Sequence, residues 1–366
     1  MSRHVAILAL VLVGGCRATL PSAYHSEHAS AVVGCQPSAC PDSDRVIRVT
    51  YLGVSGLLIE HGGHALLTAP FFSNPRLGLV RPKVSRLLRR SPRISTDTQM
   101  VERWLPKSAD AARVILVGHG HYDHLLDVPY IATHRARGAL VYGSTTVRHI
   151  LMGDETLRKD AGARVIAIPI TDAGTRDSVG AWFYSPDSAF RFMALRADHA
   201  PTFRFLWESY TFAAGAVSSD LDSLPHTAPE WKLGEPFAFL IDVLDVSHTK
   251  VVFRIFFQDA PSQPPLGFPP ISVVAERGID LAVLCAATSS NVPYTPDSLL
   301  KALHPRAVLV THWESFFRSQ NLSPEVSRGL HLDQFLKSVT KTVGPSVPWR
   351  VPLPHAVLRF AESSPR

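Results

Sequence analysis

Cysteine, long apolar runs and excess charge are all scarce in this chain, and each absence excludes a class of protein. Its 4 cysteines contain no two closely spaced pairs, so a zinc site built from two such pairs is excluded. The only long uncharged apolar run, Val5–Gly15, is far shorter than the roughly 20 residues of a membrane-spanning helix. A polytopic membrane protein is therefore excluded. The net charge of +6 does not by itself indicate a nucleic-acid-binding protein.

The composition is that of a folded protein with a large core. Hydrophobic residues make up 46% of the 366 positions, which argues against extensive disorder and allows one large domain or two ordinary ones. Histidine is unusually frequent, with 17 copies. Histidine is a common metal ligand and acid–base catalyst, so these residues are candidates for a functional site.

The N-terminal segment MSRHVAILALVLVGGC has the features of an export signal: a positive start at Arg3, an apolar stretch, and small residues before Cys16. It resembles the lipobox of bacterial lipoproteins, which implies that residues 1–15 are a signal peptide and that Cys16 is acylated. Arg17, in place of Asp, resembles cargo sorted to the outer membrane of Gram-negative bacteria. We therefore expect an exported, lipid-anchored protein of the cell envelope. The alternative is an ordinary secretory signal followed by a cysteine.

Residues 16–44 are rich in Ser, Ala and Pro and are expected to be a flexible tether, and residues 45–366 are expected to form the folded domain. Cys35 and Cys40 lie close enough in the tether to close a local disulfide in an oxidising compartment. Cys285, within the apolar run LAVLCAA, is interpreted as a buried, inert thiol.

Strand and helix patterns alternate at both ends of the domain, around a middle that is mostly β. Residues 45–70 read as a strand pair broken at Gly-Gly. Further strands are expected at 113–118, 139–143, 164–170, 182–184, 190–196, 237–242, 251–258, 281–284 and 307–311, with helices at 97–107, 125–137, 145–153, 296–303 and 331–341. This order predicts a layered α/β fold with helices on the outer faces.

A compact cluster of possible metal ligands, HGHYDH, occupies residues 119–124 directly after an apolar strand. Extended backbone places His119 and His121 on one side, because side chains alternate along a strand. The turn into a helix then brings Asp123 and His124 to a neighbouring point. Two such points suit two metal ions that share one hydroxide.

HGHYDH also matches the signature of the metallo-β-lactamase-fold hydrolases, and the resemblance extends over residues 46–318. It implies an α/β fold, a four-layer αββα sandwich, with two zinc or similar divalent ions at one edge of the sheets. The segments YLGVSGLLIE and THWESFF resemble the branch that contains N-acylphosphatidylethanolamine-hydrolysing phospholipase D and ascorbate-6-phosphate lactonase. By this resemblance the first metal is bound by His119, His121 and His199, the second by Asp123, His124 and His312, and Asp259 bridges them.

The chain departs from the family at Ala69, where LLTAP replaces an Asp-Pro whose Asp orients the ligands. Since Ala69 is not expected to be a ligand, both metals should still bind, and the effect on catalysis stays open. His226 and His248 are alternatives to His199 as the third ligand of the first metal, and the loop that contains these histidines is long.

The resemblance implies a dinuclear zinc hydrolase that uses a metal-bound hydroxide, with Asp123, Asp259 and His312 as its catalytic residues. We expect a phosphodiester or phospholipid-like ester as substrate, a small molecule or lipid, and no nucleic acid. A lactonase and a metal-bound but inactive envelope module remain as alternatives, the latter favoured by Ala69.

Three segments are candidates for contacts beyond the metals. Residues 201–231 are rich in aromatics and do not read as a strand or helix, so they form either an apolar wall over the metals or a separate small core. Residues 288–294 are a weaker candidate for polar contacts. Residues 61–96 contain seven Lys and Arg and no acid, which suits an anionic membrane surface, an anionic substrate or plain solvent exposure.

Overall fold

The computed structural model describes residues 45–80, 92–159, 162–205 and 208–363. The predicted signal peptide, Cys16, and the tether with Cys35 and Cys40 lie outside the described residues. So do residues 81–91, which carry most of the cations of the basic segment 61–96.

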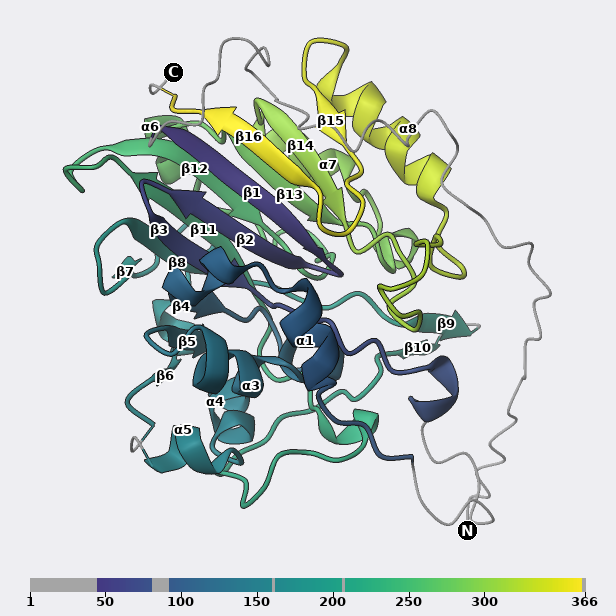
Figure 1. Ribbon diagram of the computed structural model, residues 1–366. Helices are drawn as coiled ribbons and strands as arrows, with labels where there is room; N and C mark the ends of the chain where they lie inside the picture. The colour runs from purple at the N-terminus through teal and green to yellow at the C-terminus, as the bar shows by residue number, and fades with distance from the viewer. Residues whose placement is uncertain (1–44, 81–91, 160–161, 206–207, 364–366) are drawn as a thin grey trace.

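The first of two seven-stranded sheets is built mainly from the N-terminal half of the chain and lies across the centre of Figure 1. Its order is β16-β1-β2-β3-β4-β5-β6, with antiparallel pairing from β16 to β3 and parallel pairing from β3 to β6. Its strands are β1 (Val46–Gly53), β2 (Gly56–His61), β3 (His64–Thr68), β4 (Ala112–Leu116), β5 (Leu140–Gly143), β6 (Val165–Ala167) and β16 (Val357–Ala361).

The second sheet packs against the first and has the order β15-β14-β13-β12-β11-β8-β7. Strands β12 to β15 run parallel, and β11 is antiparallel to both β12 and β8, so β8, β12 and β14 all point the same way. Its strands are β7 (Phe183–Tyr184), β8 (Phe190–Arg196), β11 (Phe237–Leu244), β12 (Val251–Phe257), β13 (Leu281–Cys285), β14 (Ala307–Thr311) and β15 (Trp349–Arg350).

Helices cover the outer face of each sheet. Over the first sheet, low in Figure 1, lie α1 (Thr98–Trp104), α2 (Tyr122–Leu125), α3 (Val128–Tyr130), α4 (Thr145–Leu151) and α5 (Glu155–Lys159). Over the second lie α6 (Ile271–Glu276), α7 (Asp297–Leu303) and α8 (Leu332–Val343). Helix α8 buries Leu332, Phe335, Leu336 and Val339, a spacing that places one apolar stripe against the sheet. None of the helices in the described part is long and apolar enough to cross a membrane.

Three separate apolar cores confirm the predicted four-layer αββα sandwich. Alternate residues of one strand point into different cores: Leu58 packs toward the outer helices, whereas Leu57 and Ile59 pack between the sheets. The third core lies between the second sheet and its helices. Because both faces of both sheets are covered, their strands are apolar almost throughout.

The strand pair expected in residues 45–70 is wrong, because this segment contains three strands. Its first turn lies at Val54–Ser55, between β1 and β2, inside a continuous apolar run. Both Gly53 and Val54 have positive φ at this turn. The sequence indicated only the second turn, through its Gly-Gly pair. The irregular reading of residues 201–231 also needs correction, since β9 (Phe203–Phe205) and β10 (Glu208–Tyr210) form a hairpin there.

Candidate metal centre

All seven predicted ligands lie at one edge of the sandwich. His119 follows β4 of the first sheet, and three others follow strands of the second: His199 after β8, Asp259 after β12 and His312 after β14. Since β8, β12 and β14 are parallel to one another, their carboxyl ends meet at the same edge. Asp123 belongs to the short helix α2, as does His124.

Close backbone packing brings the HGHYDH segment against Asp259. A Cβ atom added at Gly118 would lie 2.3 Å from the Asp259 Oδ2 atom, so only glycine fits there. His119 is fully buried and Asp259 is 3% exposed. The sequence therefore needs a glycine immediately before the cluster, and it has one.

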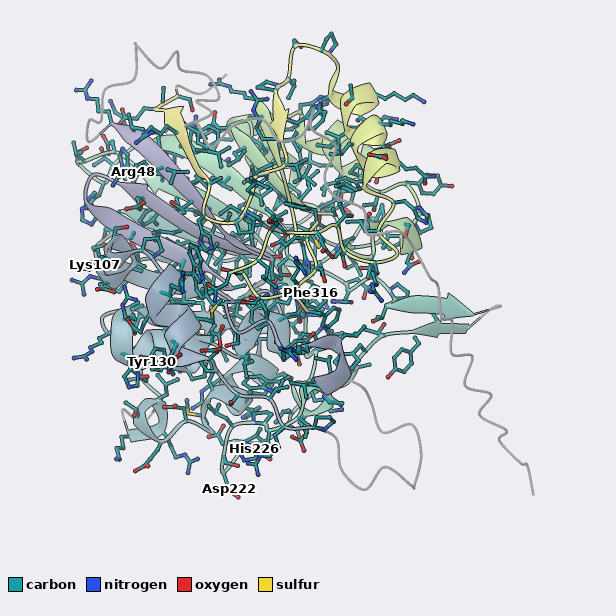
Figure 2. All side chains as sticks on the ribbon, turned by 45° about the vertical axis from the view of Figure 1, so that its right-hand side comes forward. Arg48, Lys107, Tyr130, Asp222, His226 and Phe316 are labelled. Carbon is teal, nitrogen blue, oxygen red and sulfur yellow. The ribbon has the colours of Figure 1, made fainter. Side chains whose placement is uncertain are left out.

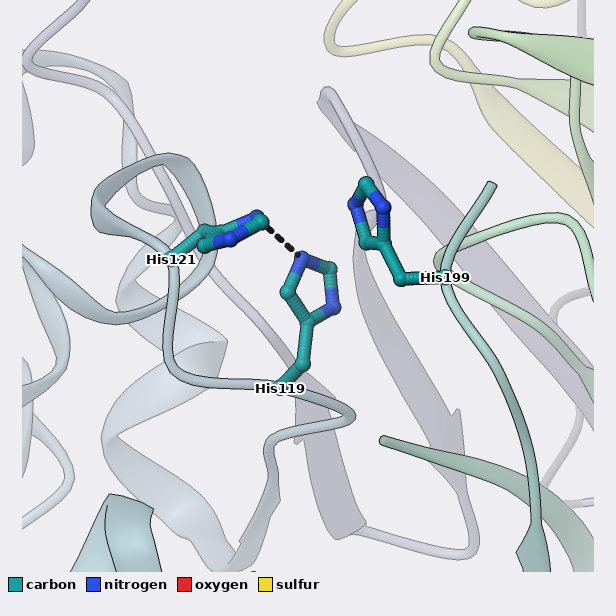
Figure 3. Close-up of side chains that lie close together, drawn as sticks. All are labelled: His119, His121 and His199. Atoms are coloured by element: carbon teal, nitrogen blue, oxygen red, sulfur yellow. Dashed lines mark hydrogen bonds between the residues drawn. The ribbon is translucent and has the colours of Figure 1, made fainter. Parts of the chain in front are cut away.

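Three imidazoles form the first group of ligands (Figure 3). The His119 Nε2 and His121 Nδ1 atoms are 3.1 Å apart, and the His199 ring centroid lies 4.8 Å from each of the other two. His199 Nδ1 is 2.7 Å from the carbonyl oxygen of Ala200. If Nδ1 carries the proton, it donates this hydrogen bond, and the lone pair of Nε2 is then free to bind a metal.

Asp123, His124 and His312 form the second group. The Asp123 Oδ2 atom lies 3.6 Å from His124 Nε2 and 3.5 Å from His312 Nε2. These separations exceed a hydrogen bond and fit ligands that surround a common point.

Asp259 connects the two groups. Its Oδ1 atom lies 3.2 Å from His119 Nδ1, and its Oδ2 atom lies 3.5 Å from His124 Nδ1. With His119 and His124 it forms a third overlapping set of possible ligands. Asp259 is therefore the residue that contacts both groups.

The donor atoms fit a divalent metal. Four nitrogen and oxygen atoms of these side chains are buried without a hydrogen-bond partner among the described residues: His121 Nε2, His124 Nδ1, Asp259 Oδ2 and His312 Nδ1. Buried polar atoms are normally paired, so several unpaired ones in one place fit the binding of a metal ion. Burial lowers the pKa of His199 to about 3 and holds the pKa values of His121 and His124 well below their usual range. Neutral imidazole is the form that binds a metal.

A pocket of about 270 Å³ opens over this cluster. Its wall is mainly apolar and consists of Leu77, Val80, Phe212, Ala260, Pro261, Ala287, Phe316 and Phe317. No Lys or Arg of the described residues lines it. A bound substrate therefore meets aromatic and aliphatic side chains around the ligands.

Two further residues, Tyr122 and Cys285, line the pocket, which the sequence did not suggest. Tyr122 lines it, is 2% exposed, and has a hydroxyl without a hydrogen-bond partner in the described part of the chain. Cys285 is buried, as predicted, but it also lines the pocket. Burial raises the pKa of the Cys285 thiol well above its usual value.

The candidate contact segments reach the pocket only in part. Phe212 lines it, with its ring 6.1 Å from that of His121, whereas Trp231 is buried in the outer core of the first sheet. The reading as an apolar wall therefore holds for Phe212, whereas Trp231 joins the large outer core of the first sheet and not a separate small core. Thr288 lines the pocket, and Asn291 donates to the Pro201 carbonyl at 2.8 Å.

The competing histidines lie elsewhere. Figure 2 shows His226 near the lower end of the molecule, away from Phe316 at the pocket. The His248 ring lies 5.5 Å from that of His64, outside the ligand groups. Ala69 is fully buried, and its backbone N–H donates to the Leu116 carbonyl at 2.8 Å.

A second cavity, of about 920 Å³, adjoins the pocket and shares Leu77 and Phe317 with it. Its charged lining consists of Arg76, Arg103, Arg318, Arg328, Asp97 and Glu325. Cations thus outnumber acids there, in contrast to the pocket over the ligands.

Solved structures of similar fold share little sequence with this chain. A metallo hydrolase from the hyperthermophilic archaeon Ignicoccus hospitalis is 14% identical, with a TM-score of 0.48, over 86% of this chain and 98% of its own. An isothiocyanate hydrolase from Delia radicum gut bacteria is 12% identical, with a TM-score of 0.47, over 86% and 99%. The metallo-β-lactamase fold protein YhfI from Bacillus subtilis is 12% identical, with a TM-score of 0.44, over 86% and 99%. No family model and no curated protein matches the chain.

Proposed function

We propose that this protein is a metal-dependent hydrolase with two divalent ions, zinc by preference, at the edge of the sandwich. One observation carries the proposal: seven His and Asp side chains converge in overlapping groups, and four of their buried atoms have no partner among the described residues. Neutral imidazoles and carboxylates are the donors that zinc-class metals take in hydrolases.

The residues divide into clear roles. His119, His121 and His199 would hold one ion, Asp123, His124 and His312 would hold the other, and Asp259 contacts both groups. A divalent ion at such a site supplies Lewis acidity and lowers the pKa of a bound water toward neutrality. With the ions bound, the Asp259 carboxylate would orient an attacking water and accept its proton, and the apolar wall would exclude other water from the reacting atoms.

The preferred substrate is a phosphodiester or phospholipid-like ester. The apolar pocket suits a lipid-like or aromatic group near the scissile bond. The arginines of the adjoining cavity suit an anionic group on the same molecule. A neutral cyclic ester such as a lactone is the second candidate, because the pocket over the ligands is small, apolar and free of Lys and Arg among its described residues.

We also propose that the protein is exported and attached to the envelope by acyl chains on Cys16. The signal-like residues 1–15 and the small residues before Cys16 support this. Detergent partitioning of the wild type and Cys16→Ser tests it. Equal solubility of the two processed proteins would reject the lipid anchor.

The test of the function is a substrate panel with controlled metal content. Purified protein is stripped with a chelator, reloaded with Zn²⁺, and assayed on bis-p-nitrophenyl phosphate, a lactone and nitrocefin. We expect hydrolysis that is lost with the chelator and restored by the metal, with the diester preferred. Metal binding without any hydrolysis would instead support the inactive module.

A further inference from the structure

A group of buried polar atoms lies directly behind His312, where β1 and β14 end. It consists of Tyr51 in β1, Val54 in the following turn, and Glu314 two residues after His312. Tyr51 is fully buried and Glu314 is 6% exposed. Neither lines the metal pocket or belongs to a group of possible ligands among the described residues.

The Glu314 carboxylate is fully engaged by the first sheet. The Tyr51 hydroxyl donates to its Oε2 atom at 2.6 Å, and the Val54 backbone N–H donates to its Oε1 atom at 2.6 Å. Both oxygens thus face the turn between β1 and β2 and are not available to a metal. The contact ties the segment after β14 to the opposite sheet.

Tyr51 and Val54 also contact the backbone of His312. Its N–H lies 2.6 Å from the Val54 carbonyl oxygen and 3.2 Å from the Tyr51 hydroxyl. The φ angle of His312 is +53°, in the left-handed region that side chains with a Cβ disfavour. Such a conformation persists where surrounding contacts impose it, and the contacts here come from Tyr51 and Val54.

The backbone conformation of the turn favours glycine at position 53, and the turn also packs against the segment after His312. Gly53 has φ +99°, and a Cβ atom there would lie 2.7 Å from Gln320 Nε2 and 3.3 Å from Glu314 Oε1. Gln320 in turn donates to the Leu52 carbonyl at 3.0 Å. The turn and the segment after His312 therefore fit each other as one rigid unit.

We propose that Tyr51 and Glu314 are positioning residues that fix His312 and thereby set the affinity of the second metal. The inference rests on the proposed metal centre, and it extends that proposal to two residues that touch no ligand atom of the metal. Tyr51 lies in the segment YLGVSGLLIE and Glu314 in THWESFF, and the hydrogen bond between them joins the two segments.

The proposed effect on metal affinity depends on the direction in which the His312 imidazole points. The His312 Nε2 atom faces Asp123 Oδ2 at 3.5 Å, and His312 reaches that position from a strained backbone. If the backbone relaxes, the ring turns away from Asp123 while the first group keeps its ligands. Residues that orient ligands typically change metal affinity by about 10–100-fold when they are replaced.

The experiment titrates metal-free protein with Co²⁺ and follows the visible absorption of each equivalent. The variants are Tyr51→Phe, Glu314→Gln and Glu314→Ala, and the matched control is Tyr142→Phe, which removes a hydroxyl from a buried tyrosine of β5. We expect one equivalent to bind about tenfold or more weakly in Tyr51→Phe and Glu314→Ala, and the other to be unchanged. Glu314→Gln keeps one accepting oxygen and should lie closer to wild type.

The outcomes separate the two proposals. If the wild type binds no Co²⁺, the metal centre itself is wrong, and this inference fails with it. If the wild type binds two equivalents and Tyr51→Phe and Glu314→Ala bind both as tightly, the centre stands and the positioning role is rejected. Variants that no longer fold, or that lose thermal stability without a change in either affinity, would show a purely structural contact and also reject it.

Discussion

The Nδ1 atom of His119 lies 3.2 Å from the Oδ1 atom of Asp259, although the two residues are 140 positions apart in the chain. His119 follows a strand of the first sheet and Asp259 follows a strand of the second. Both are buried, so the contact joins the two sheets inside the candidate centre. The centre therefore forms only when the sheets have packed together.

Replacement of Gly118 should disrupt that contact. In Gly118→Ala the new methyl group would lie 2.3 Å from the Asp259 carboxylate, so Asp259 must move. We expect a loss of about 1–3 kcal/mol in unfolding free energy, together with reduced metal content and turnover. Gly78→Ala is the control, because a methyl group there meets no atom of the described residues within 4 Å. Wild-type metal content in Gly118→Ala would contradict the close approach.

The buried carboxyl of Asp127 should make stability depend on pH. It accepts hydrogen bonds from the backbone N–H groups of Phe72 and Ser73, at 2.7 and 2.9 Å, and from the Ser73 hydroxyl. Burial outweighs these bonds and raises the pKa of Asp127 from 3.8 to about 6. The folded state then binds the proton more tightly than the unfolded state does.

Stability contributed by this group is therefore greatest below pH 4 and falls as the pH rises from about 4 to about 6, by up to about 3 kcal/mol. In Asp127→Asn this part of the dependence should disappear. Urea unfolding of metal-free wild type and variant across that range measures the difference. Parallel stability curves for the two proteins would show that Asp127 does not titrate there.

The arginines of the second cavity should matter only for an anionic substrate. In the double variant Arg76→Ser and Arg328→Ser, we expect kcat/KM for an anionic diester to fall about tenfold at low salt and less at high salt. Hydrolysis of a neutral lactone should not change. Arg45→Ser with Arg137→Ser removes the same charge at exposed positions outside both cavities. Equal losses in the two double variants would mean that overall charge, and not the cavity, is responsible.

Short-range patterns predicted most of the elements around the site. Strand β8 has the bounds expected from its apolar run, and β14 ends directly before His312, as expected. HGHYDH identified the cluster because its four possible ligands stand within six positions. The remaining ligands followed from the family resemblance, and the structure brings all seven together.

Features that depend on distant partners gave no such signal. The strand β16 pairs with β1 across almost the whole chain, and its five residues alone do not distinguish a strand from a loop. The contact between Tyr51 and Glu314 spans 263 positions, and a tyrosine within an apolar strand reads as core. Likewise, Phe316 follows His312 closely in sequence, but only the fold shows that it lines the pocket.

The metal content of wild type and His124→Ala, measured by elemental analysis alongside hydrolysis of bis-p-nitrophenyl phosphate, tests the central claim most directly. His226→Ala, which changes a histidine outside the ligand groups, is the control. The account predicts about two zinc-class ions per wild-type chain, about one in His124→Ala, and turnover lower by roughly a hundredfold or more in that variant. Unchanged metal content and full activity in His124→Ala would contradict it.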